Sequence, residues 1–114
     1  MAELDDKNID HRSVKERICG HCGRPEGVVT TRTADNDLAL IPLTKVAVLE
    51  AVHAHVEAKR RVHLERMDNN DLVYVMTDCD VGGTVLYVKV KLIPGESGTE
   101  KMLIISAHPP RRWC

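Results

Sequence analysis

Residues 84–114 read TVLYVKVKLIPGESGTEKMLIISAHPPRRWC, and this stretch decides the fold. Its two strand-like runs, 84–93 and 101–106, are separated by a loop rich in Gly and Pro, which predicts a β-hairpin. A third run, LVYVMT at 72–77, precedes them and is joined to the first by the turn residues Asp80-Val-Gly-Gly83. Strands joined by such short connections most simply form an antiparallel meander.

One clear helical pattern precedes the meander. It opens at Pro42 or Thr44, where Thr is a possible N-cap, and is expected to run to about Met67. Shorter expected elements are a helix over 10–18, a strand over 28–33 and a polar turn over 34–37. The sequence therefore predicts an α+β fold. Its antiparallel sheet would have three to four strands, packed against one long and one short helix.

Length and composition bound the class of protein. The chain has 114 residues, which suits one α+β domain over residues 11–114, and residues 1–10 read as a disordered acidic tail. A formal net charge of −1 does not indicate a strongly basic nucleic-acid binder, and 3% aromatic residues argue against base-stacking platforms. No apolar run is long enough to span a membrane, so we expect a cytoplasmic protein with no membrane partner.

The polar face of the meander carries side chains suited to phosphodiester chemistry. Side chains alternate along a strand, which places Tyr87, Lys89 and Lys91 on one face, with His108, Arg111 and Arg112 following nearby. Cleaving RNA requires a base, an acid and a cation for the developing charge. His108 could be acid or base, Tyr87 could join it if adjacent cations lower its pKa, and the Arg residues could hold phosphate. The same residues equally fit the solvated face of an ordinary sheet.

Two fragments resemble a known family. They are VTTRTA at residues 29–34 and LYVKV at 86–90, with a helix between them and a final strand ending in Ile-Ile-Ser106. This order resembles the motility quorum-sensing regulator toxins, which are small RelE-like ribonucleases that cleave messenger RNA. The resemblance implies a RelE-like fold, metal-independent endoribonuclease activity, an RNA substrate and a protein antitoxin partner, as in a toxin–antitoxin pair.

The resemblance also assigns roles residue by residue. The family's strand Tyr corresponds to Tyr87. The family places a Lys shortly after the final Ser, and His108 or Arg111 would have to take its place in this chain. We therefore expect Tyr87, His108 and Arg111 to be catalytic. The residues expected to hold the RNA backbone are Lys89, Lys91, Arg112, Arg60 and Arg61.

A pair of cysteines supports a rival interpretation. Cys19 and Cys22 have the C-x-x-C spacing of a zinc half-site in a stretch rich in Gly and Pro. A structural zinc site needs four ligands, and the possible completions are His21, His53, His55, Cys79 and Cys114. Two free thiols in a glycine turn remain the alternative. With zinc at this knuckle, the chain would be a non-enzymatic binding module of the same fold.

Overall fold

The computed structural model describes residues 2–3, 9–94 and 99–109, with backbone only at 2–3 and 9–11. Its elements in chain order are β1 (Ala2–Glu3), α1 (Ile9–Cys22), the 3₁₀ helix η1 (Pro25–Gly27), β2 (Val28–Thr30), α2 (Arg32–Leu40), α3 (Lys45–Glu57), β3 (His63–Arg66), β4 (Leu72–Val81), β5 (Thr84–Pro94) and β6 (Glu100–His108). The α+β class is confirmed.

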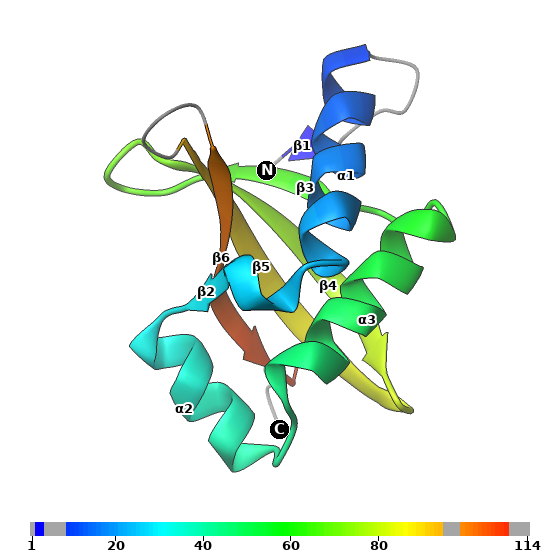
Figure 1. The fold of residues 1–114 in the computed structure, drawn as a ribbon, viewed down its shortest axis with the longest axis vertical. Coiled ribbons are helices and arrows are strands. Elements are labelled where there is room, and N and C mark those ends of the chain that lie inside the picture. The colour runs from blue at the N-terminus through cyan, green and yellow to red at the C-terminus, as the bar shows by residue number, and fades with distance from the viewer. Residues whose placement is uncertain (1, 4–8, 95–98, 110–114) are drawn as a thin grey trace.

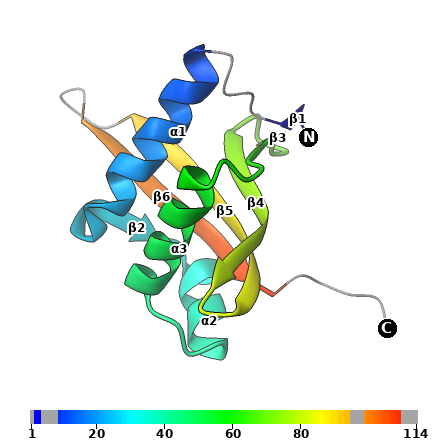
Figure 2. The ribbon, with the colours of Figure 1, turned by 90° about the vertical axis from the view of Figure 1, so that its right-hand side faces the viewer.

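The sheet is larger and more mixed than expected. Within the described residues it has six strands in the order β1-β3-β4-β5-β6-β2. The meander β4-β5-β6 is antiparallel as predicted, but β2 pairs with β6 in parallel. The prediction of three to four antiparallel strands is therefore wrong in number and direction. Figures 1 and 2 show α1 and α3 side by side over one face of this sheet, while α2 lies beside its β2–β6 end.

The helix-covered face contains an aliphatic core. Ile18 of α1 and Leu49 and Val52 of α3 have no exposed surface, and neither do Val88 and Ile104 of the sheet. Complete burial of a side chain of this size contributes about 1.5–3 kcal/mol relative to leaving it exposed. The hairpin turn between β4 and β5 is also as predicted. Gly82 and Gly83 both adopt positive φ angles, +60° and +90°, which a two-residue turn of this type requires.

Helix α2 lies where a polar turn was expected at 34–37. The Thr31 hydroxyl accepts a hydrogen bond from the Ala34 N–H at 3.1 Å, which caps the first turn of the helix. Ala34 and Leu38 are four residues apart, so both face the core and are buried. The expectation of a turn was wrong because this cap and this apolar pair outweigh the local turn propensity of Asp and Asn.

Helix α3 begins at the predicted cap, Thr44, but ends ten residues before the expected Met67. Lys59 has a φ of 57°. Its N–H donates to the Val56 carbonyl at 3.0 Å, and the next N–H, from Arg60, donates to the His55 carbonyl at 3.1 Å. This pair of bonds is the Schellman motif that terminates helices. The chain then reverses, and residues expected in the helix form β3 instead.

The N-terminal region also differs from the prediction. α1 extends to Cys22, so the cysteine pair lies in the last turn of a helix rather than in a loop. Ala2–Glu3 pairs with β3 and Ile9 begins α1, whereas a disordered tail was expected over 1–10. Residues 1 and 4–8 lie outside the described residues. Among those described, no single helix is long and apolar enough to cross a membrane; α2 and α3 pass only as a pair, bent by 96°.

Candidate functional site

Two β-bulges flank Tyr87 on the central strand β5. In β4, Met76 pairs with Val88 but Cys79 pairs with Leu86, so β4 contains one extra residue opposite Tyr87. In β6, the register shifts in the same way on the other side of β5. Bulges redirect side chains and are frequent beside active sites. The strand position that the sequence favoured is therefore the most irregular part of the sheet.

The bulge in β6 decides which face His108 occupies. Val90 pairs with Ile104 and Lys89 pairs with Ser106, which leaves Ile105 as the extra residue. Without it, strict alternation would place His108 on the core face with Ile104. With it, Ala107 enters the core, and Ser106 and His108 project on the opposite face, beside Lys89 and Tyr87.

Helix α2 holds this bulge in place through three hydrogen bonds. The Thr31 N–H donates to the Ile104 carbonyl at 3.1 Å, and the Thr31 hydroxyl donates to the Ile105 carbonyl at 2.7 Å. The Ala107 N–H donates to Asp37 Oδ2 at 3.0 Å. The first bond continues the parallel pairing of β2 with β6, and the other two give partners to β6 backbone groups beyond the last β2 pair, Thr30 with Ile104. Thr31 and Asp37 were not predicted as site residues, because only the tertiary contact with β6 gives them this role.

Tyr87 and His108 form the centre of a cleft. Their rings stack with centroids 5.1 Å apart and planes inclined by 15°, and Lys89 Nζ lies 5.9 Å from the Tyr87 centroid. The cleft has a volume of about 620 Å³. It is lined by Tyr87, Lys89, Ile105, Ser106 and His108 of the hairpin, Thr77 of β4, and Thr33 and Asp37 of α2. Thus two of the three predicted catalytic residues are brought together with one predicted RNA-binding residue.

The electrostatics of the cleft differ from the prediction. Burial raises the pKa of Tyr87 above its usual value of 10, and the nearby Glu65 carboxylate raises it further. The condition set for Tyr87, that adjacent cations lower its pKa, is therefore not met. The nearby Lys89 Nζ lies 4.0 Å from Glu65 Oε1, so its charge is shared with that carboxylate. His108 Nδ1 lies 2.8 Å from the Pro109 carbonyl and is therefore the donor, which leaves Nε2 as the acceptor of the neutral ring.

Of the other predicted RNA-binding residues that the structure describes, Lys91, Arg60 and Arg61 do not line this cleft. Arg111 and Arg112 lie outside the described residues. Lys91 forms an ion pair with Asp71, and Arg60 pairs with Asp78 at 2.8 Å between Nη2 and Oδ2. The hydrogen bond from Lys91 also lowers the pKa of Asp71. Arg60 lines a smaller cavity beside His55 instead, and the side chain of Arg61 is exposed.

The cysteines separate into two environments. Burial raises the pKa of Cys22 to about 12, helped by the neighbouring thiols of Cys19 and Cys79, and raises that of Cys79 to about 11. Cys19 is only partly buried, and its potential metal-binding neighbours among the described residues are His53 and Glu57. The predicted knuckle is thus divided, with Cys22 directed into the core.

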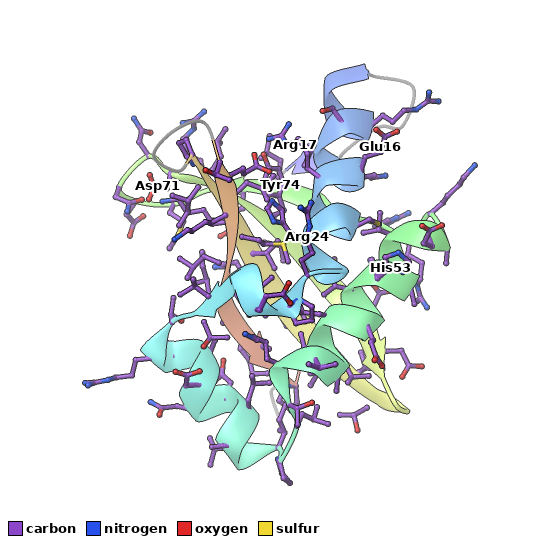
Figure 3. All side chains as sticks on the ribbon, viewed as in Figure 1. Glu16, Arg17, Arg24, His53, Asp71 and Tyr74 are labelled. Carbon is purple, nitrogen blue, oxygen red and sulfur yellow. The ribbon has the colours of Figure 1, made fainter. Side chains whose placement is uncertain are left out.

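His21, another proposed zinc ligand, belongs to a separate ionic cluster. Its Nε2 lies 2.9 Å from Glu100 Oε1, and Arg17 Nη2 lies 3.0 Å from Glu100 Oε2. Burial alone would raise the pKa of Glu100, but the hydrogen bonds from Arg17 and His21 outweigh it and lower that pKa below 4.5. Figure 3 shows Arg17 on α1 near Tyr74 of β4, whose side chain is on the helix-covered face. This cluster ties α1 to the start of β6.

The candidate site is therefore the cleft of Tyr87, His108, Lys89 and Ser106, built by two bulges and held by α2. Comparison of the chain with protein-family models, curated proteins and solved structures finds no match.

Proposed function

We propose that the cleft cleaves RNA without a metal ion, as a RelE-like endoribonuclease acting on messenger RNA in the cytoplasm and neutralised by a protein antitoxin. The observation that supports this most is the stacking of Tyr87 on His108, with centroids 5.1 Å apart, beside the Lys89 ammonium. This arrangement places a phenol, an imidazole and a cation around one cavity large enough for a nucleotide phosphate.

In the proposed reaction, His108 is the general base. Its Nδ1–H is engaged by the Pro109 carbonyl, so Nε2 carries the free lone pair that takes the proton of the ribose 2′-hydroxyl. The 2′-oxygen attacks phosphorus and forms a 2′,3′-cyclic phosphate, while the bond from phosphorus to the 5′-oxygen breaks. Lys89 stabilises the negative charge that develops on the phosphoryl oxygens.

Tyr87 then acts as the general acid. Its raised pKa keeps the phenol protonated at neutral pH, which suits donation of a proton to the departing 5′-oxygen. The proton on His108 and the proton missing from Tyr87 are exchanged with water to restore the starting state. Acid–base catalysis by such a pair contributes about 10²–10⁴-fold for each group.

The test is cleavage of a labelled RNA by the purified chain and by Tyr87→Phe, with Tyr74→Phe as the matched control. These are the two tyrosines of the chain, and Tyr74 projects from the opposite face of the sheet. We expect Tyr87→Phe and His108→Ala to lose at least about 10²-fold in rate and Tyr74→Phe to keep it. Full activity in both Tyr87→Phe and His108→Ala would refute the assignment.

A non-enzymatic binding module of the same fold is the second candidate. The pairing of Lys91 with Asp71 and of Arg60 with Asp78 favours it, because paired cations are less available to phosphates. RNA affinity as a function of salt distinguishes the two. A protein gripping the RNA backbone loses affinity steeply as salt rises, with a slope near −0.7 per phosphate contact for a single strand. A flat salt dependence without cleavage would favour the module.

A further inference from the structure

A second cluster of reactive side chains lies on the helical layer, away from the Tyr87 cleft. Cys19 of α1 and His53 and Glu57 of α3 each offer one ligand atom, and all three atoms lie within 4.8 Å of one another. His53 Nε2 is 3.5 Å from Glu57 Oε1, as expected for residues one helical turn apart. Figure 3 places His53 on α3, on the side of the molecule shared with α1.

The three ligand types indicate the metal. A thiolate, an imidazole and a carboxylate together suit Zn²⁺, which accepts sulfur, nitrogen and oxygen ligands, whereas Mg²⁺ and Ca²⁺ prefer oxygen alone. We propose that Cys19, His53 and Glu57 bind one Zn²⁺, with water in the fourth position. Binding displaces the proton of the Cys19 thiol as the zinc–sulfur bond forms.

Space for the fourth ligand is present beside the cluster. A cavity of about 420 Å³ opens there, lined by Cys19 and Glu57 together with Glu16 of α1. Arg12, Lys15 and Lys59 also line it, so the cations outnumber the carboxylates of Glu16 and Glu57. A cation held by charge alone would gain little at such a site, so the thiolate and imidazole must supply the affinity.

The proposed site differs from a zinc knuckle at the C-x-x-C pair. Cys22 is 7% exposed and faces the core near Cys79, so only Cys19 of the pair reaches the α3 ligands. A zinc ion held by Cys19, His53 and Glu57 would join α1 to α3. Its role would be to hold the two helices of this layer against each other.

The experiment is titration of the reduced full chain with Co²⁺, which replaces Zn²⁺ and gives a thiolate-to-cobalt absorption band. We expect one Co²⁺ per chain, with the band displaced by Zn²⁺. Cys19→Ser should abolish the band. His53→Ala should weaken Co²⁺ binding by more than about 100-fold, because the loss of a residue that only orients a metal ligand costs at most about 100-fold in affinity. Cys22→Ala and Glu50→Gln are the matched controls and should bind as the parent does.

Side-chain exposures of 48% for His53 and 64% for Glu57 mean that substitutions there leave the fold intact, which circular dichroism checks. A parent chain that shows no thiolate band at one equivalent of Co²⁺ would overturn the proposal. A band that persists in Cys19→Ser would overturn it too, since another thiol would then be the ligand. Loss of the band in folded Cys22→Ala would place the metal on the cysteine pair instead.

Discussion

Replacing Asp37 with Ala should release the bulge that positions His108. The Asp37 carboxylate accepts a hydrogen bond of 3.0 Å from the Ala107 N–H, and Ala107 has no exposed surface. Without the carboxylate, this N–H loses its charged acceptor, and water in the cleft that Asp37 lines is a weaker replacement. The strand is then free to relax toward regular alternation, which would turn His108 away from Tyr87.

The expected magnitude follows from two contributions, the lost hydrogen bond and the change in helix propensity. A hydrogen bond to a charged group is worth about 1.5–3 kcal/mol, a value that includes much of the cost of the unpaired donor. Ala improves helix propensity over Asp by about 0.5 kcal/mol in α2, which offsets part of the loss. The net decrease in the free energy of unfolding should be about 1–2.5 kcal/mol. Asp37→Asn keeps a neutral acceptor and should lose about 1 kcal/mol.

The assay is urea denaturation of Asp37→Ala, with Asn36→Ala as the control because Asn36 is exposed on the same helix turn. RNA cleavage is measured in parallel under conditions where both variants are folded. We expect cleavage to fall in Asp37→Ala and to be kept in Asn36→Ala. Neutral surface substitutions typically change the free energy of unfolding by no more than about 0.5 kcal/mol. If the free energies of unfolding of Asp37→Ala and Asn36→Ala differ by less than that, Asp37 does not hold the bulge.

Three further predictions concern stability and thiol chemistry. Lys59→Gly should raise the free energy of unfolding by about 0.5–1 kcal/mol, because Lys59 has a φ of 57°; an unchanged urea midpoint would contradict this. The lowered pKa of Glu100 means that its carboxylate stabilises the fold above pH 4.5 and ceases to do so as the pH falls through that pKa. Glu100→Gln should therefore unfold more easily at pH 7, by about 0.5–1 kcal/mol, and urea titrations should show the difference vanishing once the pH is below the lowered pKa of Glu100. In a Cys114→Ser chain, Cys22 and Cys79 of the folded protein should react with a disulfide reagent at least about 10²-fold more slowly than in the urea-unfolded chain, since their pKa values are about 12 and 11. Rapid reaction of both thiols in the folded protein, in addition to Cys19, would refute this.

Prediction from the sequence succeeded where local patterns are strong. The alternation in 84–93 identified a strand with Tyr87 and Lys89 on its polar face, and the double glycine at Gly82-Gly83 identified the hairpin turn. It failed where a tertiary contact outweighs local preference. The polar segment 34–37 is helical because Ala34 and Leu38 pack into the core. The long helix ends at Glu57 because a residue without turn-forming character, Lys59, adopts a left-handed conformation.

The sequence by itself determined the α+β class, the β4-β5-β6 meander and the location of Tyr87 on an exposed strand face, because side-chain alternation and turn residues act over a few positions. Only the tertiary structure decided that His108 faces Tyr87. One extra residue in β6, Ile105, reverses the side of the sheet for every residue after it, and the hydrogen bonds that hold it come from Thr31 and Asp37, about 70 residues earlier in the chain. No pattern within a strand can reveal a register that a distant helix imposes.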